Sequence, residues 1–359
     1  MKSNKIFFNS KLLYIFIIFL SLNIFFLSTV ESEGNSFDIN NIDISRPFEI
    51  NFSKNEVIDE GFKEAFFKLT KLILSTSDQK KIELTKINEI KGMIESFSIK
   101  EERFINEIYY VKLGVSFNKK KIYNYLEKKN VFPSIPIKKK ILFIPVIIDE
   151  NKKDLLIFSN NKIFKRWNDE IKNFHLIEYI LPMEDLEDLR MIKNNYESIE
   201  NYDFNEIINK YDLIDNIIAL IFKGKKEVRV LSKINIQKNV IIMNQSFLNL
   251  DINDNEQIKK MVDALKIIYE DNWKGYNQIN TSIKLPLNIK INNYDNLKIS
   301  NFEKNMNNSD LIYDFFITKF DKNFTHYQII FNGTPNTFLK NMSENKYEFD
   351  TQNKVWILK

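Results

Sequence analysis

Two short apolar runs that end on carboxylates constrain the fold of this chain most strongly. One extends over residues 138–149 (Lys-Lys-Lys-Ile-Leu-Phe-Ile-Pro-Val-Ile-Ile-Asp), and the other begins at residue 177 and leads into an acidic loop at 184–188. A continuous run of strand length, rich in Ile and Val, is typical of a strand buried on both faces by helices in an α/β fold. Open α/β sheets carry their sites at the carboxyl ends of their strands. We therefore expect any site to begin at Asp149 and at the acidic loop.

Composition places the chain among folded proteins and excludes several kinds of chemistry. Its 359 residues are 44% hydrophobic and 28% charged, which is enough for two or three cores. The formal net charge of +4 is small and spread along the chain, so it predicts no nucleic-acid partner. The absence of Cys excludes disulfides, thiolate metal sites, a lipoprotein anchor and Cys catalysis.

The N-terminus has the pattern of an export signal. Lys2, Lys5 and Lys11 precede an apolar segment at 12–30, and polar and acidic residues follow from Glu31. A basic flank of this kind stays in the cytoplasm while the chain after the apolar segment is carried outward. Residues 1–32 are therefore predicted to be either a cleaved signal peptide or a retained membrane anchor that attaches the protein through 12–30. Both alternatives predict a periplasmic protein.

Changes of hydrophobic period divide the rest of the chain into three predicted domains. Residues 33–136 start with a linker or edge segment up to residue 53 and continue with helical periodicity. The apolar positions of the two helices are listed here: Ile58, Phe62, Ala65, Phe66, Leu69 and Ile73, then Ile87, Ile90, Ile94 and Phe97. Alternation over 109–117 predicts a half-buried strand, followed by a helix at 119–129. We interpret this region as a helical N-terminal α+β module that ends at Pro133 and Pro136.

The second and third regions carry different sheets. Residues 137–275 alternate strands and helices, with buried strands at 141–148 and 215–222, and predict a central α/β sandwich-like sheet domain. Residues 276–359 show the order βαββαβ, which predicts a C-terminal ferredoxin-like domain. Both flanking domains contain a strand that ends in Phe-Asn, at Phe117 and at Phe331, and is followed by a helix. This echo is too short to establish a repeat.

The stretch Leu-Pro-Met-Glu-Asp-Leu-Glu-Asp at 181–188 carries a family resemblance. It resembles the exported proteobacterial family DUF2066, in which a similar Leu-Pro-x-x-Asp-Leu-Glu-Asp run follows a strand and precedes a helix. The resemblance covers roughly Val57 to Phe222, and it departs at 173–175, where the family tends to carry Arg-Gly. The family has no established activity. The resemblance therefore implies an exported location and this architecture, and it implies no catalytic residue.

The acidic loop has two interpretations. Acids that follow a Pro at a helix start satisfy free backbone N–H groups and the positive end of the helix dipole. Alternatively they bind a cation or a basic group of a partner, and the candidate binding residues are then Asp149, Glu184, Asp185, Glu187 and Asp188. The loop lacks the regular Asp/Asn/Gly spacing of a calcium loop, and no Gly-rich phosphate loop is present. We therefore predict no metal and no cofactor.

The sequence predicts an exported cell-envelope protein that acts as a non-catalytic binding or scaffolding module for an unknown envelope protein or polymer. His175 and His326 fall in separate predicted domains, each without an obvious Ser or acid constellation, so no catalytic residue is assigned. The alternative is an envelope hydrolase that uses the carboxylates at the strand ends. A concave polar pocket over Asp149 and Asp185, with perturbed pKa values, would indicate the enzyme, and a packed helix cap would favour the binding module.

Overall fold

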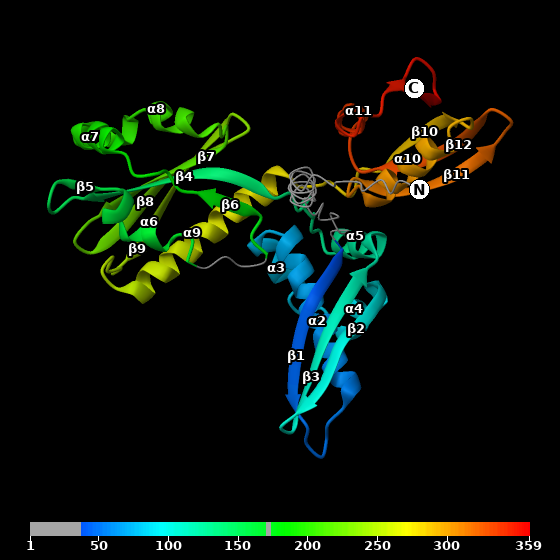
Figure 1. Cartoon of the computed structure of the whole chain (residues 1–359), viewed down its shortest axis with the longest axis horizontal. Coiled ribbons are helices and arrows are strands. Elements are labelled where there is room, and N and C mark those ends of the chain that lie inside the picture. Colours follow the sequence, from blue (N-terminus) through cyan, green and yellow to red (C-terminus); the bar gives the residue numbers. More distant parts are fainter. Residues whose placement is uncertain (1–36, 170–173) are drawn as a thin grey trace, which may run out of the picture. The chain divides into compact units, whose positions relative to one another are not determined.

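The computed structural model describes residues 37–169 and 174–359, which form an α/β fold with three sheets (Figure 1). The sheets contain three, six and five strands, and they lie within residues 38–117, 139–248 and 285–358. The predicted leader at 1–32 lies outside the described residues. None of the described helices is long and apolar enough to cross a membrane. The domain boundaries between the three sheets stay a prediction.

The first sheet is antiparallel, with strand order β1-β3-β2. The elements in chain order are β1 (Asp38–Pro47), α2 (Lys54–Ile73), α3 (Thr76–Ile82), α4 (Ile87–Met93), β2 (Ile94–Ile105), β3 (Ile108–Phe117) and α5 (Lys119–Lys128). Helix α2 begins at Ser53, whose side chain accepts a hydrogen bond from the backbone N–H of Glu56. It packs closely on the sheet at Gly61, where a Cβ would lie 2.3 Å from the side chain of Leu113. Any larger residue at position 61 would require the Leu113 side chain to move.

The segment interpreted as a linker or edge contains strand β1, which lies at an edge of the sheet and pairs with β3 along most of its length. One prediction for this region is wrong. The second predicted helix stops at Met93, so that Ile94 and Phe97 belong to strand β2. The spacing of Ile94 and Phe97 fits the period of a helix. Strand β2 exposes most of its residues, so its sequence lacks the alternation of apolar and polar residues that would indicate a strand. The pairing with β3 determines the structure here instead of the local pattern.

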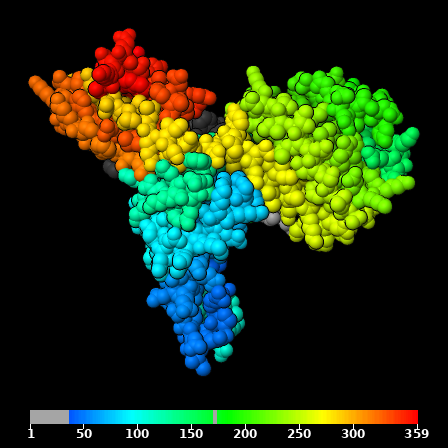
Figure 2. Space-filling view, turned by 180° about the vertical axis from the view of Figure 1, so that it is seen from behind, coloured from blue at the N-terminus to red at the C-terminus, as the bar shows by residue number. Residues whose placement is uncertain are grey.

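The central sheet has the strand order β5-β4-β7-β8-β9, and β6 also pairs with β4. Its elements are β4 (Lys139–Asp149), β5 (Asp154–Leu156), α6 (Lys162–Arg166), β6 (Ile177–Ile180), α7 (Leu186–Asn194), α8 (Asn205–Ile208), β7 (Asn216–Lys223), β8 (Glu227–Ile236), β9 (Asn239–Leu248) and α9 (Asn255–Tyr276). Strands β6, β4 and β7 are parallel, whereas β8 and β9 add antiparallel strands at one side. In the space-filling view these residues, green to yellow, form one close-packed body (Figure 2).

Strand β4 is buried on both faces, which confirms the prediction from its apolar run. Ile141, Phe143 and Ile147 belong to the core beneath α6 and α9. The residues between them belong to the core on the opposite face, with α7 and α8: Leu142, Ile144, Val146 and Ile148. Successive side chains of a strand point to opposite faces, so one continuous apolar run supplies both cores. Figure 1 shows α7 and α8 on one side of the sheet and α6 and α9 on the other.

Pro145 lies in the middle of β4, a position where a central strand needs its backbone N–H. The neighbouring edge of β4 is paired by β6 only up to Leu142 and by β5 only from Ile147, so a gap remains between them. The buried side chain of Asn161 donates to the carbonyl oxygen of Pro145 at 3.0 Å. The N–H and C=O of one strand residue point the same way, so the missing N–H of Pro145 also faces the gap. The strand therefore loses no ladder hydrogen bond.

The third sheet has the strand order β11-β12-β10-β14-β13. Its elements are β10 (Leu285–Asn292), α10 (Asn296–Asn308), β11 (Ile312–Phe320), β12 (Phe324–Phe331), α11 (Pro335–Glu344), β13 (Phe349–Asp350) and β14 (Trp356–Leu358). Both helices contribute to one core with the strands, through Phe302 and Phe338. The predicted order holds through α11. An extra short strand, β13, then reverses the chain, so β14 pairs parallel to β10 at the place of the last ferredoxin-like strand.

The two flanking sheets share one connectivity. Apart from the short helices α3 and α4, which lie between α2 and β2, strand, helix, strand, strand and helix follow in the order β1, α2, β2, β3, α5 and again in the order β10, α10, β11, β12, α11. In both, the third strand of the unit lies between the other two. The echo at Phe117 and Phe331 falls at the same position of the two units, at the end of that middle strand. The first and third sheets are therefore two examples of one βαββα arrangement.

Candidate functional site

The acidic loop begins helix α7, and Asp185 is its N-cap. The Asp185 carboxylate accepts hydrogen bonds from the backbone N–H groups of Glu187, at 2.7 Å, and Asp188, at 3.4 Å. Glu187 is exposed in the first turn, where a negative charge meets the positive end of the helix dipole. Glu184 accepts from the backbone N–H of Ser159 at 2.9 Å. The capping interpretation of Asp185 is confirmed.

Lys210 joins two of the loop acids. Its ammonium nitrogen lies 2.9 Å from the Asp185 carboxylate and 2.7 Å from the Asp188 carboxylate, which is buried. The hydrogen bond from Lys210, together with that from the Glu187 N–H, lowers the pKa of Asp185 below its ordinary value. The hydrogen bonds to Asp188 and Asp185 in turn raise the pKa of Lys210. The three charges therefore form a structural ion cluster that fixes α7 to the segment before β7.

Replacing Asp185 with alanine should lower the free energy of unfolding by about 1 kcal/mol, because α7 loses its N-cap. Asp185→Asn should retain most of this stability, because its side-chain oxygen still accepts the same N–H groups. Thermal and denaturant unfolding of the two variants beside the parent chain measures the difference. The exposed Glu187 provides a control as Glu187→Ala. A biological activity lost in Asp185→Ala at an unchanged melting temperature would contradict a purely structural role.

Asp149 also has structural partners. Its buried carboxylate accepts the backbone N–H groups of Asn151 and Lys152, each at 3.1 Å, and lies 3.0 Å from the ammonium nitrogen of Lys223. Burial opposes ionisation, but the hydrogen bonds from Lys223 and from the Lys152 N–H outweigh it and lower the pKa of Asp149. Strand β6 ends beside Leu142, so its carboxyl end does not reach the level of Asp149. Asp149 and Asp185 line none of the main crevices of the described residues, so the shared pocket that would have indicated the enzyme is not seen among them.

The order of the parallel strands points to a position between β4 and β7, and not to the acidic loop, as the place for a binding site. From β4 the chain crosses to β6 on one side through α6, and then to β7 on the other side of β4 through α7 and α8. The two crossovers lie on opposite faces of the sheet (Figure 1). The strand order therefore reverses between β4 and β7. In open α/β sheets a ligand binds outside the carboxyl ends of the strands at this switch point.

An open crevice of about 550 Å³ lies at the carboxyl end of β7, and we call it the switch-point crevice. It is lined by Asn151, Lys223, Gly224, Lys225, Lys226, Asn249, Leu250, Asp251 and Ile252. Lys225 and Lys226 are exposed, and the described residues offer them no ion pair. The one lining acid, Asp251, accepts the backbone N–H of Asn253 at 2.8 Å. The crevice therefore presents two available positive charges.

A second crevice, of about 760 Å³, lies between the end of β1 and helix α2. Its charged lining residues are Arg46, Glu49, Glu56, Asp59, Glu60 and Lys63. The Arg46 guanidinium pairs with both carboxylate oxygens of Glu60, at 2.8 and 2.9 Å. Acids and bases are mixed here and partly paired, so the crevice has no single charge preference.

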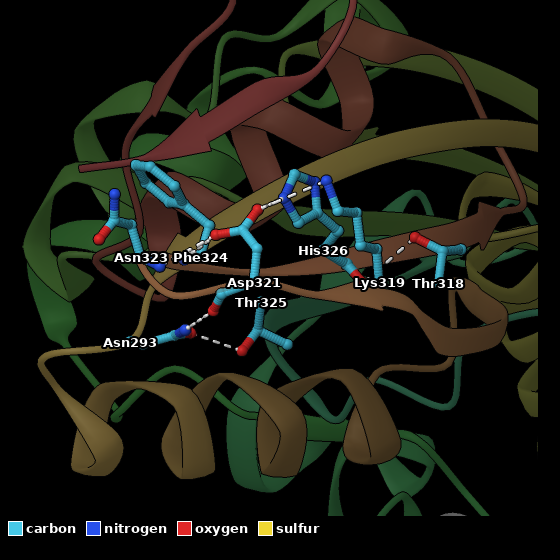
Figure 3. Close-up of polar contacts among 8 residues, drawn as sticks. All are labelled: Asn293, Thr318, Lys319, Asp321, Asn323, Phe324, Thr325 and His326. Atoms are coloured by element: carbon cyan, nitrogen blue, oxygen red, sulfur yellow. Dashed lines mark hydrogen bonds and ion pairs between the residues drawn. The ribbon is translucent and has the colours of Figure 1, made fainter.

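A His–Asp pair that the sequence did not predict occurs at the turn between β11 and β12 (Figure 3). The His326 ring nitrogen Nε2 lies 2.8 Å from the Asp321 carboxylate, which also accepts the backbone N–H groups of Asn323 and Phe324. The two adjoining hydroxyl groups bond elsewhere: Thr325 donates to Asn293 and Tyr327 donates to Glu303, each at 2.7 Å. The pair has no hydroxyl nucleophile hydrogen-bonded to it among the described residues. The hydrogen bonds of Asp321 stabilise the turn between β11 and β12.

The His326 and backbone hydrogen bonds lower the pKa of Asp321 to about 2, from the ordinary value of about 3.9. A carboxyl group whose pKa is lower in the folded state stabilises the fold above its unfolded pKa, and the contribution is lost as the pH falls through the folded pKa. Asp321→Asn should therefore lower the melting temperature between about pH 4 and 6, and the difference should shrink to nothing near pH 2. Glu348→Gln, an exposed site, is the control. A difference that does not change with pH would contradict this assignment.

No family model matches the chain, and no curated protein matches it. One of the solved structures that match is the crystal structure of an uncharacterized protein, at 9% sequence identity. The match covers 40% of this chain and 95% of the other, with a TM-score of 0.16. Similarity at this level carries no argument about fold or function.

Proposed function

We propose that this chain is a non-catalytic binding or scaffolding module of the cell envelope, exported by its N-terminal segment and related to the DUF2066 family, which it resembles over residues 57–222. The proposal of a non-catalytic role rests on one observation: the carboxylates at the strand ends are engaged in structural contacts. Asp185 caps a helix, Asp188 pairs with Lys210, and Asp149 pairs with Lys223 and closes its own loop. These contacts stabilise the fold.

The pKa directions support the same proposal. A hydrolase that uses a carboxylic acid as proton donor needs a raised pKa near its working pH. The pKa values of Asp149 and Asp185 are instead lowered by their hydrogen bonds, so both groups are ionised at neutral pH. Neither group is therefore suited to act as the proton donor of a hydrolase, which favours the binding module over the alternative of an envelope hydrolase.

The ligand of the module would be an anionic group of an envelope component, held in the switch-point crevice. Two exposed lysines at the carboxyl end of β7 supply the charge, and the crevice is open enough for a headgroup or a polymer segment. Each lysine near an anionic surface contributes about 1 kcal/mol of attraction. This ligand class is consistent with a scaffolding role at a membrane or wall surface.

Charge reversal in the crevice tests the proposal. The double variant Lys225→Glu/Lys226→Glu should bind vesicles that contain phosphatidylglycerol at least about tenfold more weakly than the parent chain, with a weaker dependence on salt. The matched control, Lys322→Glu/Lys354→Glu, changes the net charge equally at exposed sites of the third sheet. Equal losses in both double variants would indicate unspecific charge attraction. A parent chain that binds neither anionic nor neutral vesicles would exclude an anionic lipid as the ligand.

Export requires its own test, because the leader lies outside the described residues. An alkaline phosphatase fused after Lys359 should be active in intact cells, since that enzyme works only outside the cytoplasmic membrane. The same fusion without residues 1–32 is the control and should be inactive. An inactive full-length fusion of normal abundance would reject the envelope location.

A further inference from the structure

The central sheet ends at strand β9, whose outer edge has no partner strand among the described residues. Strand β9 is ten residues long and pairs with β8 from Asn239 to Leu248, so its inner edge is fully used. An edge of this length presents alternate backbone N–H and C=O groups to solvent. Such an edge is a template for another strand.

The composition of β9 distinguishes it from the other described edge strands. Its sequence, Asn-Val-Ile-Ile-Met-Asn-Gln-Ser-Phe-Leu, contains no charged residue and no proline. The long edge strands β1, β2 and β11 all carry charges, five of them on β2, and the remaining edges at β5, β6 and β13 are four residues or shorter. Soluble proteins protect their edges by charge, proline or short length. β9 has none of these protections.

One face of β9 is also apolar and exposed. Met243 and Phe247 point toward the core beneath α9 and are partly buried. The residues of opposite parity point away from α9, and among them Val240 and Ile242 are each 64% exposed and Leu248 is 75% exposed. The strand therefore exposes apolar side chains near both ends, while the side chains between them, Asn244 and Ser246, are polar.

The apolar ends of this face meet each other when the strand is paired with a reversed copy of itself. In an antiparallel pair about a two-fold axis perpendicular to the sheet, directly opposite residues lie on the same face, so their numbers share parity. The register centred on Asn244 pairs residues 240–248, and it places Val240 opposite Leu248 and Ile242 opposite Ser246. The neighbouring register, centred on Met243, leaves Leu248 unpaired and places Val240 opposite Ser246. The first register buries more apolar surface, and because β9 has no charge, two copies meet without repulsion.

We propose that β9 pairs with β9 of a second copy of this chain, in the register centred on Asn244, to join two central sheets into one continuous sheet. The pairing of one apolar end with the other favours a second copy over an unrelated extended peptide. An isologous two-fold contact of this kind closes on itself and gives a dimer without further growth. The proposal does not depend on the anionic ligand.

Charge placed on the two-fold axis gives the sharpest test. In this register Asn244 faces itself, so Asn244→Lys and Asn244→Asp should each weaken the dimer at least about tenfold, because like charges lie directly opposite. Mixing the two variants should restore a heterodimer. Sedimentation velocity of the full chain in mild detergent measures both effects, and Leu186→Lys, at an exposed residue of α7, is the control. A parent chain that stays monomeric, or a dimer unaffected by Asn244→Lys, would overturn the proposal.

Cross-linking tests the register in the native envelope. The chain has no Cys, so Asn244→Cys introduces a single thiol that should meet its copy and form a disulfide-linked dimer on mild oxidation. Val240→Cys should not cross-link by itself, because it faces Leu248, whereas cells that express Val240→Cys and Leu248→Cys chains together should give the mixed dimer. Cross-linking of Val240→Cys alone as readily as Asn244→Cys would overturn the register.

Discussion

Replacing Phe143 with alanine should lower the free energy of unfolding of the central domain by about 3 to 5 kcal/mol, the usual cost of removing a buried aromatic side chain. Phe143 is fully buried in β4 and stacks on Trp167, with ring centroids 3.8 Å apart and an interplanar angle of 22°. Its edge also meets the ring of Tyr179. The cavity left by alanine would remove contacts with both rings. Denaturant unfolding followed by amide exchange in β4 and β7 measures the loss.

A conservative change on the other face of the same strand provides the control. Ile144→Val deletes one methylene from the opposite core and should lower the free energy of unfolding by about 0.5 to 1.5 kcal/mol. Phe143→Leu should fall between the two variants, because it keeps most of the buried volume. If Phe143→Ala were no more destabilising than Ile144→Val, the stacked arrangement of Phe143 and Trp167 would be wrong.

Glu270→Ala should have a comparable effect through hydrogen bonds. The buried Glu270 carboxylate, on α9, accepts the backbone N–H of Leu176 at 3.1 Å and that of Ile177 at 2.9 Å. Both residues lie at the buried start of β6, where water cannot replace the acceptor. Leaving a buried donor unsatisfied costs about 1 to 3 kcal/mol, so the variant should lose about 2 to 6 kcal/mol. Equilibrium unfolding and amide exchange at Leu176 and Ile177 measure the effect.

The pH dependence of Glu270→Gln distinguishes charge from hydrogen bonding. Burial raises the pKa of Glu270, although the hydrogen bonds from Ile177 and Leu176 partly oppose it. A raised folded-state pKa means that this group favours the fold most at low pH, and the contribution falls as the pH rises through the folded pKa. Glu270→Gln should therefore reduce the fall in stability above the ordinary glutamate pKa of about 4.3. Identical pH profiles for Glu270→Gln and the parent chain would mean that Glu270 is hydrated in the folded protein.

The sequence predicts those elements whose burial is complete. The runs at 141–148 and 215–222 identify β4 and β7, because a strand covered on both faces needs apolar residues at every position. Strand β2 was missed and β1 was predicted only as a linker or edge segment, because each leaves much of its surface in solvent, where charged residues interrupt any alternation. Their pairing depends on β3, which lies far along the chain from β1. Local pattern contains no information about that partner.

The candidate site, like the fold, has one part that the sequence predicts and another part that it does not. Capping by Asp185 was predictable, because a cap depends on residues two and three positions later in the same helix. The switch-point crevice was not predictable, because it combines the end of β7 with Asn249 and Asp251, which follow β9, and with Asn151, which follows β4. These segments meet only through the strand order. The His326–Asp321 pair depends on the hairpin register, which places the two side chains on the same side of the turn.

The position of α9 has a consequence for how the protein is made. Synthesis proceeds from the N-terminus, so β4 and β6 emerge long before the helix that covers them, and Glu270 follows Leu176 by 94 residues. Until α9 emerges, one apolar face of the growing sheet is bare and the N–H groups at the start of β6 lack their acceptor. Nascent chains that stop before Asn255 should therefore depend on chaperones and be degraded rapidly, whereas chains that extend past Tyr276 should resist proteolysis.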